Sequence, residues 1–463
     1  MLFNSYGFIF LFLPLSVLGF HLLARSTQGK MAFDWLIGLS FVFYSWENPE
    51  NFPILLGSLL ANHAIARAMG ADDATPPAVR TKHRRGFLLF LGIAFNLLLL
   101  GYYKYFSQLP LGISFFTLTQ VMYLVDCYQG VVPPATFREH ALLAAFFPTV
   151  SMGPLLRARE MTRQLDNPAT LGLNARHLAQ ALFLFSIGLC KKTVIADSFS
   201  RLADAGHAST ASLSMMEAWV SSAAFTMQIY YDFSGYSDMA VATALLFGIR
   251  IPINFNSPYQ ARSIVDFWMR WHISLSNFIT TYLYTPIIRS FRKITFAKAM
   301  FATFAAMMIA GIWHGSSLNF MIFGALHGLG LIVNQLRKKN KKPRLPAWLA
   351  WFVTILYINL AFIFFRADTV PHAWEMIASL VNTQAPFSNE SWHRSSLYIT
   401  SRLDLLIPII MGVLMIFHKK NSNQLSMEFM PTWKNLLLAT TAMLTSLVYM
   451  NTNVPKEFLY FNF

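Results

Sequence analysis

Apolar runs separated by short polar segments recur along the whole chain. Several approach the roughly 20 residues that a helix needs to cross a bilayer, and the shorter ones are expected to be tilted, re-entrant or buried against neighbours. The pattern predicts an all-α, polytopic membrane protein of about 10–12 transmembrane helices with re-entrant and interfacial helices. The runs are Phe8–Leu23, Trp35–Tyr44, Phe52–Ala66, Phe87–Leu100, Leu111–Val125, Ala141–Val150, Leu178–Leu189, Ala218–Ile229, Ala299–Trp313, Leu318–Val333, Trp348–Phe365, Leu405–Phe417 and Leu436–Met450.

Composition agrees with this pattern. Of 463 residues, 55% are hydrophobic and only 12% are charged, which excludes a soluble domain with an ordinary charged surface. The first apolar run lacks a preceding basic segment and a following cleavage site, so we expect it to be retained as an anchor. The two cysteines, Cys127 and Cys190, are expected to be buried thiols, since two residues can build neither a disulfide framework nor a metal site.

The net charge of +15 indicates membrane topology rather than nucleic-acid binding. Its Lys and Arg residues cluster in short loops between apolar runs, at residues 80–85, 337–344 and 419–420. Such loops stay in the cytoplasm. Counting back through three apolar runs from the first cluster predicts an extracytoplasmic N-terminus, and the polar insert 368–402 is expected outside as well.

Two polar segments interrupt the apolar pattern in the middle of the chain. Phe146–Glu160 contains Pro and Gly, and a broken segment is tolerated at membrane depth only where protein or a cavity covers its backbone, so we predict a re-entrant element there. Gln228–Asp238 (QIYYDFSGYSD) holds Asp232 and Asp238, with a turn expected at Gly235. A hydrogen-bonded polar junction, a substrate contact and a metal site all remain open for these carboxylates, although no His or Cys stands at ligand spacing.

An amphipathic helix is predicted next, at the membrane interface or capping an opening. Arg262, Asp266 and Arg270 repeat every four residues, which suits ion pairs along one face. His272 adjoins the apolar face and by itself reads as a hydrogen-bonded structural histidine. The apolar face comprises Ile264, Phe267, Trp268, Trp271, Leu275 and Phe278.

His314 stands between Trp313 and Gly315 inside an apolar run, where an ionisable group requires an explanation. It could be a proton relay, a metal ligand, a satisfied core residue or a general base. His327 follows thirteen residues later, but the run is broken between them, so a pair of metal ligands at helical spacing is not indicated. A neutral imidazole can accept the proton of an attacking hydroxyl, as acyl transfer from a thioester requires.

Several ordered motifs between Leu109 and Asn334 resemble the membrane-bound O-acyltransferase family, in particular its bacterial branch that acetylates exopolysaccharides such as alginate and cellulose. The teichoic-acid D-alanyl transfer proteins are related to that branch. The motifs are LPLGISFF, FFPTVSMGPLLRARE, QIYYDFSGYSDMA, INFNSPYQARSIVDFWMRWHISLSNF, TYLYTPI and GIWHGSSLNFMIFGALHG.

The resemblance implies a helical funnel through the membrane with a catalytic histidine at its constriction. The family's essential histidine falls on His314, and its supporting histidine on His272. The family's Gly-rich basic turn corresponds here to Ile287–Lys293, which lacks glycine, so contacts specific to that turn are not carried over. Candidate substrate-binding residues are Trp313, Asp232, Ser237, Asp238, Arg270, Trp271 and Asn319.

We therefore expect one membrane-embedded domain over residues 1–463, with N-terminal helices in 1–106, a catalytic core in 107–336 and C-terminal helices in 337–463. The predicted activity is transfer of acetyl from a cytoplasmic thioester, acetyl-CoA or an acyl carrier protein, to an extracytoplasmic polysaccharide. No bound cofactor, metal or nucleic acid is expected. Membrane lipid and a separate periplasmic or membrane-anchored transfer protein are the expected partners, in a bacterial inner membrane. D-alanyl transfer to teichoic acid and a proton-coupled transporter are the alternatives.

Overall fold

The computed structural model describes residues 1–26, 29–70, 79–208, 210, 213–383, 403–452 and 458–459. These residues are mostly helical and contain no strand. The later part of the insert, residues 384–402, lies outside the described residues. The helices are η1 (Phe8–Phe12), α1 (Leu13–Ser26), α2 (Lys30–Ser45), α3 (Asn51–Gly70), α4 (Val79–Phe106), α5 (Ile113–Tyr128), α6 (Phe137–Ala145), α7 (Phe147–Val150), α8 (Ala158–Leu165), η2 (Pro168–Leu171), α9 (Ala175–Cys190), η3 (Lys191–Ala196), α10 (Asp197–His207), α11 (Met215–Leu246), η5 (Pro258–Gln260), α12 (Ile264–Trp268), α13 (Ile273–Phe278), η6 (Ile279–Tyr284), α14 (Thr285–Arg289), α15 (Phe296–His314), α16 (Leu318–Lys339), α17 (Ala347–Arg366), α18 (Val370–Leu380), α21 (Leu403–Ile416), α22 (Ser422–Met427) and α23 (Trp433–Thr452).

The predicted all-α, polytopic membrane architecture is confirmed. Seven of the described helical segments are long and apolar enough to cross a membrane, and α2 and α21 contain shorter apolar stretches. Large apolar side chains lie exposed along several helices, for example Phe90 and Leu98 on α4 and Leu436 on α23. Side chains of this kind face lipid in a membrane protein, because lipid tails are as apolar as they are.

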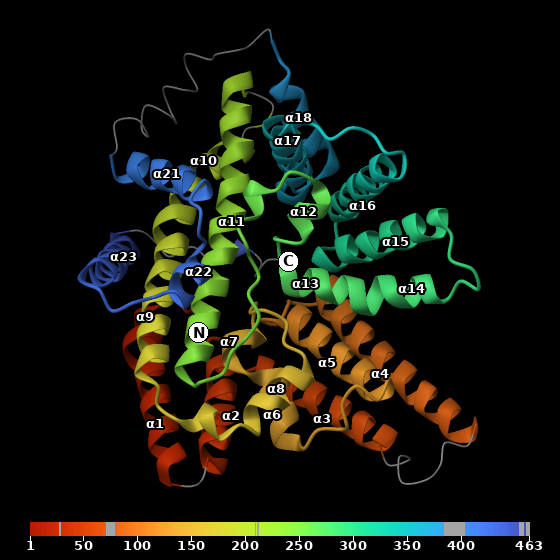
Figure 1. Cartoon of the computed structure of the whole chain (residues 1–463), viewed down its shortest axis with the longest axis vertical. Helices are drawn as coiled ribbons and strands as arrows, with labels where there is room; N and C mark the ends of the chain where they lie inside the picture. The colour runs from red at the N-terminus through yellow and green to blue at the C-terminus, as the bar shows by residue number, and fades with distance from the viewer. Residues whose placement is uncertain are drawn as a thin grey trace.

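The long helix α11 runs lengthwise through the middle of the molecule (Figure 1). Helices α1–α8 gather at one end in this view, α9 and α21–α23 lie on one side of α11, and α12–α17 lie on the other (Figure 1). A capping box in which Ser214 and Glu217 satisfy each other's backbone N–H groups starts α11.

The turn expected at Gly235 does not form, and this prediction was wrong. Gly235 lies inside the continuous helix α11, where it faces Gly188 of α9. A Cβ on Gly235 would come 2.7 Å from the carbonyl oxygen of Gly188, and a Cβ on Gly188 would come 2.8 Å from that of Gly235. The glycine therefore permits two helix backbones to cross closely, as small residues commonly do between membrane helices.

A second close crossing joins α15 and α16. A Cβ on Gly311 would come 2.4 Å from the carbonyl oxygen of Phe320, and one on Gly324 would come 2.6 Å from that of Met307. The three residues Gly315, Ser316 and Ser317 connect the two helices. This tight hairpin fixes the end of α15, which carries His314.

The single amphipathic helix predicted around residues 262–278 is instead two short helices, α12 and α13. The break falls at His272, whose backbone adopts the left-handed conformation with φ 42°. A non-glycine residue in that conformation is strained by an energy of order 1–3 kcal/mol and persists only where surrounding contacts hold it. The predicted apolar face is nevertheless buried throughout, and Arg270 Nε forms the expected ion pair with Asp266 Oδ1 at 2.7 Å.

The Pro- and Gly-containing segment Phe146–Glu160 is broken and buried, as expected. It forms the single turn of α7, a non-helical stretch and then α8. Gly112, at the start of α5 with φ +68°, lies so close to this stretch that a Cβ would come 2.2 Å from the carbonyl oxygen of Val150. Protein thus covers the irregular backbone, as a broken segment at membrane depth requires. Its re-entrant course through a bilayer stays a prediction.

Candidate active site

His314 is the last residue of α15 and lies deep in the molecule, with 4% of its surface exposed. Aromatic rings surround it. Its imidazole contacts the rings of Trp313, Phe323 and Phe365 at centroid distances of 4.9, 5.9 and 5.3 Å. Aromatic walls of this kind exclude bulk water from the imidazole while leaving few competing polar groups.

A cavity of about 280 Å³ lies beside Gly315, the residue that follows this histidine, and His314 itself is not among the described residues that line it. Phe365, which touches the His314 ring, is part of the cavity wall. The cavity is formed where the ends of α4, α15 and α17 and the start of α16 meet. Its lining comprises Tyr103, Lys104, Ser107, Leu109, Gly315, Ser316, Ser317, Phe320, Phe365, Arg366, Ala367 and Asp368.

Lys104 is the residue of this site that sequence reasoning missed. Its Nζ donates a hydrogen bond to the carbonyl oxygen of Trp313, so a cation from α4 is held one residue from His314. Lys104, His272 and His327 all lie within electrostatic range of the His314 imidazole. A lone lysine near the end of an apolar helix usually extends towards the membrane surface, and the sequence contains no sign that this one points inward.

His272 is brought to the same region from the break between α12 and α13. Only 1% of its surface is exposed, and its ring lies between those of Phe115 and Phe233, at centroid distances of 6.4 and 4.7 Å. Neither ring nitrogen has a hydrogen-bond partner among the described residues. Burial lowers the pKa of His272, which lies outside the candidate membrane spans, to about 3, so its imidazole is neutral at pH 7.

Asn254 holds the strained turn at His272 in place. Its backbone carbonyl accepts from the N–H of Ile273 at 3.0 Å, and its Oδ1 accepts from the N–H and the Oγ of Ser274 at 3.2 and 2.6 Å. Asn254 Nδ2 in turn donates to Ser237 Oγ on α11 at 3.4 Å. The candidate residue Ser237 therefore supports the His272 turn through Asn254.

His327 lies on α16 and has a different environment. Trp268 Nε1 donates to His327 Nδ1 at 3.2 Å, and the imidazole packs 4.5 Å from the ring of Phe323. Phe323 thus separates His327 from His314, because it contacts both rings. These contacts fit a histidine that ties α12 to α16.

The other candidate residues near this region form hydrogen bonds with the surrounding backbone or pack in the core. Asn319 Nδ2 donates to the carbonyl oxygen of Ala367 at 2.5 Å, which joins the start of α16 to the end of α17 at the cavity. Trp271 packs among aromatic rings, including Phe255 at 5.0 Å. Arg270 contacts Asp266 and the carbonyl oxygen of Asn256.

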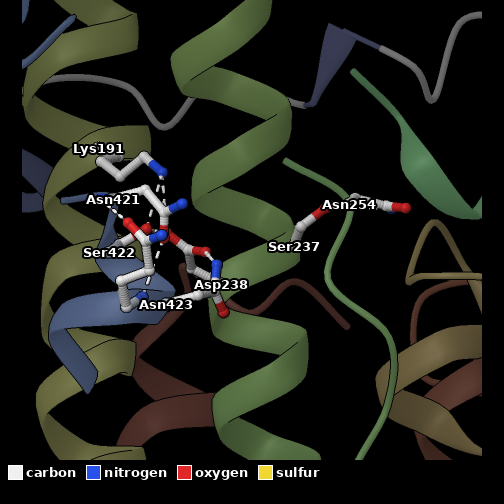
Figure 2. A network of polar contacts seen from close by, with 8 residues as sticks. Lys191, Ser237, Asp238, Asn254, Asn421, Ser422 and Asn423 are labelled. Atoms are coloured by element: carbon white, nitrogen blue, oxygen red, sulfur yellow. Dashed lines mark hydrogen bonds and ion pairs between the residues drawn. The ribbon is translucent and has the colours of Figure 1, made fainter. Parts of the chain in front are cut away.

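The two carboxylates of α11 form buried ion pairs with consecutive lysines of η3. Asp232 Oδ1 lies 2.6 Å from Lys192 Nζ, and Asp238 Oδ2 lies 2.8 Å from Lys191 Nζ. Figure 2 shows that Lys191, Ser422 and Asn423 converge on Asp238, while Ser237 points to the other side of α11. Of the three roles that the sequence left open for these carboxylates, this geometry fits a hydrogen-bonded polar junction between helices. The sequence analysis did not predict that lysines would be their partners.

A third polar cluster joins Asp126 of α5 to residues of two quoted motifs. Tyr282 Oη donates to Asp126 Oδ1 at 2.8 Å, and Arg157 Nη2 donates to Thr281 Oγ1 at 2.9 Å. The Arg157 guanidinium also lies over the Tyr282 ring, 5.7 Å from its centroid. This cluster connects α5, the segment before α8, and η6.

Buried histidines beside a polar cavity, enclosed by membrane helices, are features of an intramembrane enzyme rather than of a simple anchor. Comparison with known proteins defines the class. Residues 136–370 match the membrane-bound O-acyltransferase family. The chain belongs to this family and is an O-acyltransferase.

The relatives cover from just over half of this chain to all of it. A peptidoglycan O-acetyltransferase of Helicobacter pylori is 33% identical over 100% of this chain and 98% of its own length. A probable alginate O-acetylase of Pseudomonas aeruginosa is 33% identical over 86% of this chain and 77% of its own. A teichoic acid D-alanyltransferase of Bacillus subtilis is 29% identical over 57% of this chain and 70% of its own.

Proposed function

We propose that this protein transfers acetyl from a cytoplasmic thioester to a hydroxyl group of an extracytoplasmic polysaccharide, with His314 as general base. The observation that carries the proposal is the position of His314. It is enclosed by aromatic rings beside a cavity whose lining includes Lys104. The polysaccharide is proposed because the two relatives that cover most of this chain are named for acetylation of peptidoglycan and alginate.

In the proposed reaction, His314 removes the proton of the acceptor hydroxyl as its oxygen attacks the thioester carbonyl carbon. The carbon–sulfur bond breaks, the acetyl group becomes an ester of the acceptor, and the thiolate takes the proton from the His314 imidazolium. Lys104 lies close enough to the site to favour the negative charge that develops on the carbonyl oxygen. His272, which is neutral and has no hydrogen-bond partner for either ring nitrogen among the described residues, is proposed to orient donor or acceptor.

The distribution of basic residues supports an outward-facing cavity. Helices α4, α16 and α17 each have a basic cluster at or beside one end and the cavity at the other. Because loops rich in Lys and Arg remain in the cytoplasm, the proposal places residues 80–85 and 337–344 inside and the cavity outside. The same orientation puts the N-terminus outside, in a bacterial inner membrane.

The donor is proposed to approach from the opposite face, near Arg157 and Tyr282. Acetyl-CoA and an acyl carrier protein both carry the acetyl thioester on a long, flexible arm, so either suits a reaction centre below the surface. Arg157 and the basic turn that contains Arg289 and Arg292 would attract the negative charge of either donor.

A separate periplasmic or membrane-anchored protein is proposed to receive the acetyl group or hold the polymer. The cavity of about 280 Å³ is slightly smaller than ordinary ligand sites, which span roughly 300–1,000 Å³, and a polysaccharide needs an extended groove. D-alanyl transfer is the weaker candidate, since the relatives named for it cover about half of this chain.

The test is reconstitution in proteoliposomes with radiolabelled acetyl-CoA, or an acetylated carrier protein, on the cytoplasmic side. Wild-type protein with its partner should label the polymer on the other side, and His314→Ala should not. Without the partner, we expect thioester turnover but little labelled polymer. Strong polymer labelling by the isolated chain would refute the partner, and equal labelling by His314→Ala would refute the assigned base.

A further inference from the structure

A larger cavity, of about 740 Å³, lies on the side of α11 away from His314. Its walls come from α9, η3, α11, η5, α21, α22 and α23, and none of the residues assigned to acyl transfer lines it. Helices α21 and α23 both pack on η3, and the cavity fills the space between them. Its volume falls within the roughly 300–1,000 Å³ of ordinary ligand sites.

The body of the cavity is apolar. From α23 it is lined by residues at helical spacing, Leu438, Thr441, Ala442, Thr445 and Tyr449, so one complete face of this helix is turned inward. From α21 come Ile407, Pro408, Met411, Met415 and Ile416. Water would find few of the two to four polar partners that it requires in such a space, whereas hydrocarbon would gain dispersion contacts there.

One end of the cavity is polar and basic. His418, Lys420, Asn421 and Ser422 line it together, next to Lys191. Lys191 is paired with the buried Asp238, and Lys420 forms an ion pair with Glu428, a residue outside the lining. Among the described residues, the lining contains no carboxylate. Lys191 is neutralised by Asp238, but Lys420 and Glu428 are 49% and 57% exposed, and an exposed ion pair of this kind is weak, so Lys420 and His418 favour an anionic group at this end.

The cavity is continuous with the bilayer-facing surface of α21. A shallow groove on that surface shares Ile407, Met411, Met415 and His418 with the cavity lining. Its remaining residues, Ile410 and Leu414, are exposed apolar side chains of a kind that contacts lipid. A molecule already in the membrane can therefore enter sideways without passing through water.

We propose that this cavity binds one glycerophospholipid with an anionic headgroup. Its acyl chains occupy the space between α21 and α23, and its phosphate lies at Lys420 and His418. The acyl chains contribute little to the choice between lipids, because the bilayer itself is as apolar as the cavity. The basic end provides the preference for an anionic headgroup. The bound lipid fills the gap between the C-terminal helices and the core and so stabilises their packing.

Two adjacent threonines of α23 provide a matched test of the chain site. Both are exposed, but Thr441 lines the cavity and Thr440 lines none of the cavities described above. The full-length protein is purified in mild detergent, and co-purified phospholipid is measured by native mass spectrometry. Wild type and Thr440→Trp should retain a bound phospholipid, and Thr441→Trp should lose it. Equal retention by the two tryptophan variants would overturn the proposal.

The headgroup is tested in nanodiscs that contain phosphatidylglycerol or phosphatidylcholine. The wild-type Tm should be higher in phosphatidylglycerol. Lys420→Ala should reduce this difference, and Lys434→Ala, which removes an exposed lysine at the start of α23, should not. A wild-type Tm that is equal in the two lipids, or a difference unchanged by Lys420→Ala, would overturn the anionic headgroup.

Discussion

The three histidines around the candidate active site differ in the contacts that their side chains make. His327 accepts a hydrogen bond from Trp268 and ties two helices together. His272 has no partner for either ring nitrogen among the described residues and is held by a strained turn. His314 adjoins the cavity wall and lies near a lysine. The contacts therefore separate a structural histidine from two that are positioned for chemistry.

His314→Ala is predicted to lower acetyl transfer by about 10²- to 10⁴-fold, the usual contribution of a general base. Its Tm should stay close to that of the wild type, because the change removes a base rather than a large packing volume. The measurement is transfer from radiolabelled acetyl-CoA in proteoliposomes, with Tm in parallel. His327→Ala is the control: it should lower Tm clearly and reduce the transfer rate much less than His314→Ala does. Full activity of His314→Ala would contradict its role as base.

His272→Ala is predicted to reduce transfer by the same factor as His314→Ala or less, since His272 is proposed to orient a substrate. Asn254→Leu should reproduce the effect on transfer, because it leaves the N–H of buried Ser274 without its acceptor and releases the turn. An unsatisfied buried group costs about 1–3 kcal/mol, so this variant should also have a lower Tm. Normal transfer by both variants would remove His272 from the mechanism.

At the scale of the helices, glycines at close crossings fix the site. The α15–α16 hairpin holds His314 where it is because Gly311 and Gly324 let the two backbones approach. Gly324→Val is predicted to lower Tm and transfer together, since its side chain would collide with the carbonyl oxygen of Met307 at 2.6 Å.

Gly57 on α3 is the matched control for this substitution, because nothing lies within 4 Å of the position that its Cβ would occupy. Gly57→Val should leave transfer unchanged. If both valine variants behave alike, the close crossing is not what positions His314.

Helix α11 contacts α9 closely and is joined by charge to η3, which directly follows α9. Lys192 and Asp232 are both buried, and removing one partner of such a pair costs up to about 3–5 kcal/mol. Without Asp232, Lys192 keeps Asp197, whose Oδ1 lies 3.2 Å from its Nζ. Asp232→Leu alone should therefore lower Tm strongly, while Lys192→Met with Asp232→Leu should recover part of the loss. A double variant that is less stable than the single one, as judged by Tm in detergent, would show that the pair does more than join the helices.

At the scale of the whole molecule, the basic clusters and the cavity lie at opposite ends of the same helices. Reporter tags at Lys82, Lys339 and Lys419 are predicted to be cytoplasmic, and a tag at Ser388, in the insert, extracytoplasmic. The measurement is labelling of the tags in intact and permeabilised cells. Labelling of Lys339 and Ser388 from the same side would contradict the predicted count of membrane crossings.

The sequence by itself determined the class of protein and its central histidine. Apolar runs near the length of a membrane helix, with basic residues between them, can form few structures other than a helical membrane domain, because each helix satisfies its own backbone hydrogen bonds. His314 was conspicuous because an ionisable residue within an apolar run is costly without a purpose. The ordered motifs then indicated the family.

Only the tertiary structure decided which residues meet. Whether Gly235 makes a turn or a crossing depends on Gly188, and the partners of Asp238 include Ser422, 184 positions away in the sequence. Lys104 reaches Trp313 across 209 positions. Local sequence patterns report periodicity and local conformation, whereas these pairings arise from how separate helices pack. The cavity beside His314 and the lipid-sized cavity beside α23 therefore arise only when the helices pack together.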